Sequence, residues 1–345
     1  MKYALTAAAT FALLSSCSSS APDKPPVAEE KKAETPAKPA AQPAGAGGIL
    51  RVDAALNGLV PAGAKIEKVA GGFQFTEGPL WFKESGNLWF SDVQGNVVRQ
   101  LAPDGAVTEI LKPGGFDGKD APEGAFIGPN GMTFDKDGNV LIAQHGNRRI
   151  ARRNKAGVVT TLVDRFEGKR LNSPNDLVFK TDGALYFTDP PYGLTKQDDD
   201  PKKELPYNGV FRLKNGKLTL LNKEMTRPNG IAFSPDEKWL YVANSDAARK
   251  AWMKFPVQED GTLGPGSVFA DVTAEQGEGL PDGLKVDAKG NVWATGPGGI
   301  WIFSPEGKHL GTIQPTEVPA NCAFAEDGSV LWMTARTSVY RIKLK

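Results

Sequence analysis

Histidine and cysteine are scarce in this chain, with two of each among 345 residues. Structural zinc sites, iron–sulfur clusters and disulfide frameworks use these residues in quantity, so the sequence argues against all three. A metal bound by this protein would therefore be held by oxygen atoms. An excess of one charge is lacking as well, because 41 basic and 40 acidic side chains give a net charge of +1. Nucleic acid, which needs a basic surface, is not expected as a partner.

Long hydrophobic runs are also missing. The N-terminal run 4–14 has 11 residues, about half of the ~20 that a membrane helix needs. It leads into LSSC at 14–17, which resembles a bacterial lipobox, where the signal peptide is cleaved before the cysteine and a lipid is attached to the sulfur. We predict a signal peptide over 1–16 and lipidation of Cys17, with an ordinary secretory signal as the alternative. Ser18, in place of Asp, favours the outer membrane of the bacterial cell envelope, facing the periplasm.

Residues 17–48 continue from the predicted anchor with Ser, Ala, Pro, Lys and Glu, including six prolines and no aromatic residue. A segment of this composition cannot bury enough apolar surface to fold. We predict that it is a disordered tether between the lipid and a folded domain at 49–345. The membrane is thus expected as a partner only through the N-terminal lipid.

One pattern recurs six times in the rest of the chain. A polar residue opens a short alternating run, a turn such as Asp-Gly follows, and a second run rich in apolar and aromatic residues comes next. The openings are 39 to 54 residues apart, and the second runs are NLWFSD (87–92), NVLIAQ (139–144), ALYFTD (184–189), WLYVAN (239–244), NVWATG (291–296) and VLWMTA (330–335). Asp-Gly between alternating runs indicates a β-hairpin.

Repeated hairpin units at this spacing predict an all-β fold, a six-bladed β-propeller with about 47 residues per blade. No stretch shows a sustained helical period. We expect a strand near 65–70 to pair beside the C-terminal SVYRIKL (338–344) and so complete the last blade. A pair of β-sandwiches is the alternative, but sandwiches do not repeat internally.

The residue that opens each repeat is polar in all six. Equivalent positions of the blades lie at equivalent places around the channel, so six oxygen-bearing side chains should converge at one end of it. They are Glu77, Asn130, Asn175, Asn229, Asp282 and Asn321. Asn and Asp also suit turns, which is the alternative explanation, but Glu77 in the same column has no turn preference.

Converging carboxylates and amide carbonyls favour a hard cation. Ca²⁺ accepts about 6–8 oxygen ligands in flexible geometry, whereas Mg²⁺ demands an octahedron. The two ring carboxylates, Glu77 and Asp282, balance the charge of one divalent cation. We predict Ca²⁺, with another divalent cation as the alternative, at the central channel. Four protein ligands would leave positions open for water and substrate, which separates a catalytic metal from a structural one.

The chain resembles the SMP-30, gluconolactonase and luciferin-regenerating-enzyme family over roughly 66–343. The motifs that carry the resemblance are FTEGPLW (75–81), SPNDLVF (173–179), FTDPPYG (187–193), RPNGIAFSPD (227–236) and LPDGLKVD (280–287). The resemblance implies a six-bladed, calcium-dependent propeller. Diisopropyl-fluorophosphatase and paraoxonase propellers are more distantly similar.

The resemblance also implies site residues. The family's metal ligands match Glu77, Asn229 and Asp282, and Asn175 is a ligand in one branch and a substrate contact in another. We therefore predict these four as metal ligands. The predicted substrate-binding residues are Asn130, Asn175 and Asn321. Ser173 stands where the regucalcin branch has Arg, so the sugar-lactone specificity of that branch is not carried over, and FTDPPYG looks more like the bacterial gluconolactonase branch.

Two residues are candidate general bases, Asp282 and His145. Paraoxonase-like propellers carry a His in a place comparable to His145, which implies a catalytic role. The alternative is a His that caps a strand-end turn beside Arg148 and Arg149. An unperturbed imidazole base predicts activity that rises between about pH 5.5 and 7.5.

The predicted function is metal-dependent hydrolysis of a lactone, a sugar lactone or similar small cyclic ester, by a monomer. The cation would polarise the carbonyl and stabilise the oxyanion. One alternative is a phosphotriester hydrolase, and another is a non-catalytic binding propeller with a structural calcium. A metal-free scaffold is disfavoured by the polar ring. We expect the Gly-rich loop 113–128 to cover the channel mouth and the acidic run 198–200 to lie on its rim.

Overall fold

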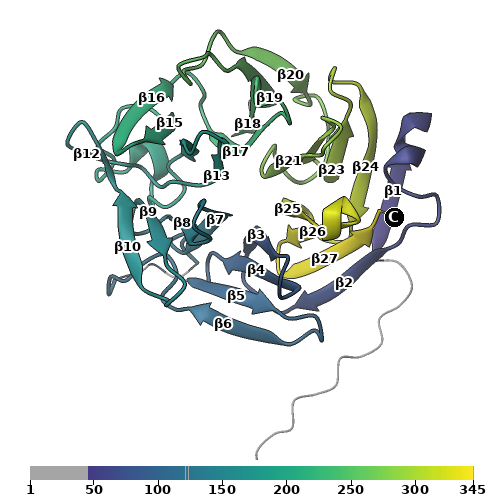
Figure 1. Cartoon of the computed structure of the whole chain (residues 1–345), viewed down its shortest axis with the longest axis horizontal. Coiled ribbons are helices and arrows are strands. Elements are labelled where there is room, and N and C mark those ends of the chain that lie inside the picture. The colour runs from purple at the N-terminus through teal and green to yellow at the C-terminus, as the bar shows by residue number, and fades with distance from the viewer. Residues whose placement is uncertain (1–45, 121, 123, 345) are drawn as a thin grey trace, which may run out of the picture. The chain divides into compact units, whose positions relative to one another are not determined.

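The repeated hairpins form six antiparallel sheets of four or five strands, arranged as blades around a central channel (Figure 1). The computed structural model describes residues 46–120, 122 and 124–344. The predicted signal peptide, Cys17 and all but the last residues of the tether lie outside these ranges. Besides strands, the described part contains the 3₁₀ helices η1 (Ala54–Gly58), η2 (Gln197–Asp199) and η3 (Glu326–Gly328). None of its helices has the length and apolar character needed to cross a bilayer.

The first three blades follow the chain from the innermost strand outward. Blade one contains β3 (Thr76–Phe82), β4 (Asn87–Asp92), β5 (Val97–Leu101) and β6 (Val107–Leu111). Blade two contains β7 (Pro129–Phe134), β8 (Val140–Gln144), β9 (Arg149–Arg153) and β10 (Val159–Val163). A small hairpin of β11 (Arg165–Phe166) and β12 (Lys169–Arg170) precedes blade three. Blade three contains β13 (Leu177–Phe179), β14 (Leu185–Asp189), β15 (Gly209–Lys214) and β16 (Lys217–Asn222).

The remaining blades include two strands from the N-terminal part of the domain. Blade four contains β17 (Pro228–Phe233), β18 (Trp239–Asp246), β19 (Arg249–Pro256) and β20 (Ser267–Asp271). Blade five contains β21 (Leu284–Val286), β22 (Val292–Gly296), β23 (Gly299–Phe303), β24 (His309–Pro315) and β1 (Gly47–Arg51). Blade six contains β25 (Pro319–Ala325), β26 (Val330–Ala335), β27 (Ser338–Lys343) and β2 (Ile66–Gly71). The six predicted second runs are thus the second strands of the six blades.

The core of the propeller is divided among the spaces between blades. Each pair of neighbouring blades encloses one cluster of buried hydrophobic side chains, six clusters in the described part of the chain. Successive residues of a strand point to opposite faces, so Tyr186 of β14 packs toward blade four while Phe187 packs toward blade two. This explains why the second strands read as continuous apolar runs, since both of their faces are buried.

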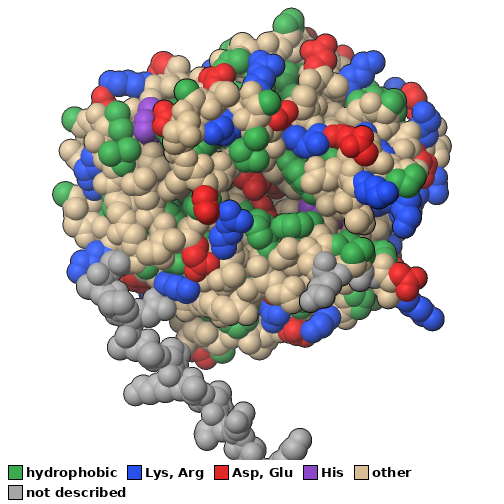
Figure 2. Space-filling model, turned by 180° about the vertical axis from the view of Figure 1, so that it is seen from behind, with side chains coloured by type: hydrophobic (Ala, Val, Ile, Leu, Met, Phe, Trp, Pro, Cys, Tyr) green, Lys and Arg blue, Asp and Glu red, His purple; other side chains and the backbone are tan. Residues whose placement is uncertain are grey.

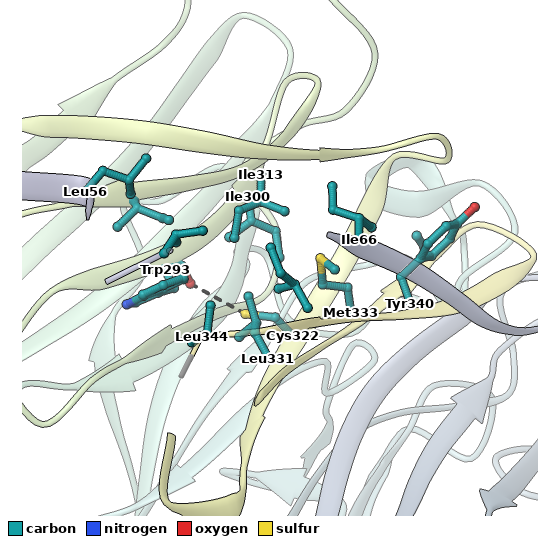
Figure 3. Packing of buried hydrophobic residues seen from close by; sticks show 14 of the residues in the cluster. Leu56, Ile66, Trp293, Ile300, Ile313, Cys322, Leu331, Met333, Tyr340 and Leu344 are labelled. Carbon is teal, nitrogen blue, oxygen red and sulfur yellow. Dashed lines mark hydrogen bonds between the residues drawn. The ribbon is translucent and has the colours of Figure 1, made fainter. Parts of the chain in front are cut away.

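The ring is closed by pairing the two ends of the domain. β2 pairs with β27 in a register that places Ile66 opposite Ile342, which confirms the predicted closing strand. β1 was not predicted: it pairs with β24 at the outer edge of blade five and begins at Gly47, two residues before the expected domain boundary. Figure 3 shows Leu56 and Ile66 packed with Trp293, Ile313 and Tyr340 between blades five and six, so the N-terminal segment shares the core of the last two blades. The neighbouring Cys322 is a free, buried thiol.

Candidate functional site

The six ring residues lie at or just before the start of an innermost strand. Glu77, Asn130, Asn229 and Asn321 belong to β3, β7, β17 and β25, and Asn175 and Asp282 precede β13 and β21 by two residues. All are at most 4% exposed apart from Asp282, which is half-buried. Because the innermost strands all run in the same direction along the channel, the starts of these strands, and with them the ring residues, lie at one end of it.

Close contact between innermost strands fixes the ring. Gly78 follows Glu77 with φ +47°, and a Cβ there would lie 2.0 Å from the carbonyl oxygen of Asn130 in the next blade. Only glycine fits such an approach. Hydroxyl groups near the ends of the second strands add hydrogen bonds across blades: Ser91 Oγ donates to the Asn130 carbonyl at 2.6 Å, and Thr188 Oγ1 to the Asn229 carbonyl at 2.8 Å. The backbone of each of these ring residues is therefore held by the preceding blade.

The ring opens into a cavity of about 220 Å³. Five of its six members line the cavity, namely Glu77, Asn130, Asn175, Asn229 and Asp282. Figure 2 shows a hollow near the middle of one face, with acidic side chains at its floor. The other lining residues are Phe75, Phe126, His145, Tyr192, Gln197, Ser245 and Leu280.

Asn321 does not line the cavity. Its Nδ2 donates to Glu77 Oε2 at 3.0 Å, and its Oδ1 accepts the backbone N–H of Cys322 at 2.8 Å. The side chain lies behind Glu77, with its polar atoms already engaged. This placement supports a role in holding Glu77 rather than the predicted contact with substrate.

His145 is 1% exposed and orients two ring amides. Its Nδ1 lies 3.1 Å from the carbonyl oxygen of Phe126, and because a carbonyl only accepts, Nδ1 carries the proton. Nε2 then presents a lone pair to Nδ2 of Asn130 at 3.2 Å and of Asn175 at 3.5 Å. Both amides are turned so that their nitrogen faces the imidazole and their oxygen faces away from it.

Burial lowers the pKa of His145 to about 4. The imidazole is therefore neutral at physiological pH. Its titration falls below the range of about pH 5.5–7.5 that an unperturbed His145 would give.

The donor set of the pocket fits a divalent cation. Among the six ring residues, three buried oxygen atoms have no hydrogen-bond partner: Oδ1 of Asn130, of Asn229 and of Asp282. A buried acceptor without a partner costs about 1–3 kcal/mol, and a cation would satisfy several of them together. No group of three or more His, Cys, Asp or Glu side chains within the described ranges is arranged to bind a metal. A site here would depend on Asn oxygens beside Glu77 and Asp282.

The two ring carboxylates are strongly perturbed. Burial raises the pKa of Glu77 to about 7, and the neighbouring charge of Asp176 adds to the effect. Burial also raises the pKa of Asp282 well above its usual value, with further contributions from Glu77 and Asp176. Like charges in a buried site disfavour ionisation, so a positive charge placed among them would favour the ionised form of both carboxylates. This is the electrostatic signature expected of an oxygen site for a cation.

One wall of the cavity is apolar. Phe75 and Phe126 pack edge to face with ring centroids 5.0 Å apart, and Leu280 lies on the same lining. Phe126 belongs to the Gly-rich loop 113–128, so this loop does reach the channel mouth. Burial raises the pKa of the Tyr192 hydroxyl, which stays protonated with Ser245 and Asn229 as polar neighbours.

Ser173 fixes the turn that carries Tyr192. Its Oγ donates to the carbonyl of Pro190 at 2.6 Å and accepts the N–H of Gly193 at 2.9 Å. The serine is fully buried and does not line the cavity. Ser173 therefore holds the turn after β14, which carries Tyr192 of the cavity lining.

The acidic run 198–200 directly follows Gln197, which lines the cavity, and none of its three side chains belongs to the cavity lining. Asp198 pairs with Arg227 and accepts from Asn208 Nδ2 at 3.0 Å. Asp200 accepts backbone N–H groups within its own loop. These bonds hold the loop so that Gln197, at its tip, reaches the cavity.

Sequence reasoning missed part of the site. Tyr192 was visible in FTDPPYG but received no role, and Phe75 preceded Glu77 without being singled out. Leu280 opens the motif LPDGLKVD but was not assigned to the site, and no motif marks Gln197 or Ser245. They meet the ring only because loops from different blades converge on one end of the channel.

The fold and the pocket define a class, the six-bladed β-propellers with an oxygen-rich site at one end of the channel. The chain belongs to the family described as the SMP-30/gluconolactonase/LRE-like region, which matches residues 75–337. This confirms the family inferred from the motifs.

Three relatives show how far the likeness extends. A gluconolactonase of Zymomonas mobilis is 41% identical over 312 residues, covering 87% of this chain and 86% of the relative. The structure of a gluconolactonase from Xanthomonas campestris superposes with a TM-score of 0.77 and 31% identity, over 89% of this chain and 99% of that one. Regucalcin from Agrobacterium tumefaciens, described as a calcium-binding protein, shares the fold at a TM-score of 0.62 and 22% identity, over 82% and 95%.

Proposed function

We propose that this protein is a calcium-dependent hydrolase of a small lactone. The observation that carries the proposal is the cavity in which Glu77 meets the unpartnered side-chain oxygens of Asn130, Asn229 and Asp282, in a chain related to gluconolactonases. Glu77, Asn175, Asn229 and Asp282 would hold the cation. When bound there, it would polarise the ester carbonyl and stabilise the negative charge that develops on its oxygen.

The chain's own groups account for the remaining chemistry. Asp282 has an unpartnered oxygen in the cavity, which places a carboxylate where it would take a proton from the attacking water. The water oxygen bonds to the carbonyl carbon, the ring C–O bond breaks, and the proton reaches the departing oxygen, giving an open-chain hydroxy acid. His145, neutral and donating to Phe126, keeps the amides of Asn130 and Asn175 in the orientation that presents their oxygens.

The cavity supports a small, polar ring as the substrate. Its volume of about 220 Å³ lies below the ~300–1,000 Å³ of sites for larger ligands. Asn130, Gln197 and Ser245 offer hydrogen bonds to hydroxyl groups, and Phe75 and Phe126 offer one apolar face. A hydroxylated five- or six-membered lactone meets both requirements, and a lactone with a long substituent does not.

A hydrolysis screen tests the proposal. Purified protein would be assayed with aldonolactones, aromatic lactones and phosphotriesters, with calcium and after chelation. We expect turnover of aldonolactones that chelation abolishes and calcium restores. Preferential hydrolysis of phosphotriesters would contradict the lactonase proposal and identify the protein as a phosphotriester hydrolase. If the protein bound calcium but hydrolysed none of these esters, it would be a non-catalytic binding propeller.

We further propose that the enzyme is held at the bacterial cell envelope by a lipid on Cys17. The support is the lipobox-like LSSC and the tether composition of the following residues. Cys17→Ser should move the protein from the membrane fraction to the soluble fraction without changing its specific activity, because the cysteine lies outside the folded domain. Retention of the variant in membranes would contradict the lipid anchor.

A further inference from the structure

An ion pair between a buried aspartate and a partly exposed lysine lies next to the ring. Asp176 is 3% exposed; its Oδ1 accepts the N–H of Leu177 at 2.9 Å, whereas its Oδ2 has no hydrogen-bond partner. The ammonium of Lys285 lies 4.0 Å from that oxygen. Asp176 follows ring residue Asn175 in blade three, and Lys285 belongs to β21 in blade five. The pair therefore spans the channel between two non-adjacent blades.

The ammonium is also linked to a ring carboxylate. Lys285 Nζ donates to the carbonyl of Leu284 at 3.0 Å and reaches Oδ1 of Asn321 at 3.5 Å. Asn321 in turn donates to Glu77 Oε2 at 3.0 Å. Lys285 thus stands between Asp176 on one side and the Asn321–Glu77 pair on the other.

The charges explain why a lysine is placed here. Glu77, Asp282 and Asp176 interact electrostatically with one another across the channel. Three carboxylates would bring three negative charges to the site, which suits a trivalent ion or a second divalent ion. With one ammonium among them, two net negative charges remain, and these match one divalent cation.

We propose that Lys285 is a positioning residue for the cation site: its ammonium cancels the charge of Asp176 and so limits the ring to a single divalent cation. The inference rests on the proposed cation site and adds the residue that sets its charge. Lys285 touches neither the cavity nor the substrate path, since it is absent from the cavity lining. It acts through Asp176 and Asn321.

A charge-restoring set of variants tests the proposal on the purified full chain. Calcium affinity and stoichiometry would be measured by calorimetry for Lys285→Met, Asp176→Asn and the double variant. Lys285→Met should bind Ca²⁺ about tenfold or more tightly, because removing a unit positive charge near the site removes its repulsion of a divalent cation. It should also favour Tb³⁺ over Ca²⁺ more than the wild type does. Asp176→Asn should bind about tenfold more weakly, and the double variant should return close to the wild type.

The matched control is Lys289→Met, which removes an exposed lysine from the same hairpin of blade five. It should leave calcium affinity unchanged. If Lys285→Met does not fold, Asp176→Asn and Lys285→Gln carry the same test. A double variant that keeps the calcium affinity of either single variant would overturn the role of Lys285, because the effect of a purely structural lysine is not reversed by restoring the charge. A wild type that binds no calcium would instead overturn the cation site itself.

Discussion

At the scale of single residues, the ring is notable for its use of asparagine. Four of its six members are Asn, which offer carbonyl oxygens without charge, and only Glu77 and Asp282 are acidic. An amide that binds the cation must be turned so that its oxygen faces the site, and for Asn130 and Asn175 the lone pair of His145 provides that orientation. The carboxylates are thus the proposed ligands and base, whereas the imidazole orients amides, and substitutions can distinguish these roles.

Asp282→Asn removes the proposed base while keeping the size of the side chain and an oxygen that can bind the cation. We expect turnover to fall by about 10²–10⁴, the scale of losing an acid–base group, with the fold retained. Steady-state kinetics at saturating calcium measure the effect. Asp104→Asn, in an exposed turn of blade one, is the control and should behave as the wild type. An unchanged rate in Asp282→Asn would exclude Asp282 as the base and leave it as a ligand.

His145→Gln tests whether the imidazole moves a proton or holds the amides. A glutamine oxygen can still accept from Asn130 but cannot take a proton, so we expect turnover within about tenfold of the wild type. His145→Leu cannot accept at all and should lose both activity and calcium affinity.

The pH profile of turnover is the second readout of this experiment. Because burial lowers the pKa of His145 to about 4, an imidazole base would be protonated and inactive only near or below that pH. If His145→Gln lost most of its turnover, and the remaining activity lost its acid limb near pH 4, His145 would be the base after all.

At the scale of elements, the closure of the ring depends on one glutamate. Glu317, in the connection between β24 and β25, pairs with Lys68 of β2 at 2.9 Å. It also accepts hydrogen bonds from Thr337, Ser338 and Tyr340 at and beside β27. These contacts join β2 and β27, the two outer strands of blade six, whose pairing completes the propeller. They hold the pKa of Glu317 at about 2 against the opposing effect of burial.

Glu317→Gln should lower the free energy of unfolding by about 1–3 kcal/mol at pH 7, because hydrogen bonds and an ion pair to a carboxylate are lost. The folded-state pKa is depressed, so this stabilisation is complete above the unfolded-state value near 4.5 and is lost as the pH falls toward 2. The gap between wild type and variant in denaturant unfolding should therefore close over that range. Glu84→Gln, an exposed control, should show no gap at any pH. A gap that persists at pH 2 would contradict the account.

At the scale of the whole molecule, the proposed cation site would connect blades that share no hydrophobic cluster. Hydrophobic clusters bind each blade to its two neighbours only. The proposed ligands Glu77, Asn175, Asn229 and Asp282 belong to blades one, three, four and five. A cation held by them would connect non-adjacent blades at the centre.

Removing calcium should therefore destabilise the entire domain. A ligand present at 100 times its dissociation constant stabilises the native state by about 2.7 kcal/mol, so chelation should lower the melting temperature by roughly 5 °C or more. Metal analysis of protein purified without chelator should find about one equivalent of a divalent cation. Asp282→Asn should show a smaller response to calcium. A melting temperature and an activity that are both indifferent to chelation would contradict the cation site.

The sequence by itself determined the repeat, the hairpins and the family. Local alternation and Asp-Gly turns specify strands and their order because they act between neighbours in the chain. The closing strand was predictable as well, since the last repeat lacked a partner for SVYRIKL. β1 was not, because GGILR at 47–51 belongs to no repeat and its pairing with β24 depends on a sheet edge built some 260 residues later.

The tertiary structure decided the details of the pocket. The column of polar residues predicted a ring, but only the packing of innermost strands shows that five members line the cavity while Asn321 stands behind Glu77. The role of His145 likewise depends on burial and on the carbonyl of Phe126, which a linear sequence does not reveal. The pairing of Asp176 with Lys285 joins blades three and five across the channel. Side-chain environment is set by residues distant in the chain, and for that reason the chemistry of the site follows from the fold rather than from its motifs alone.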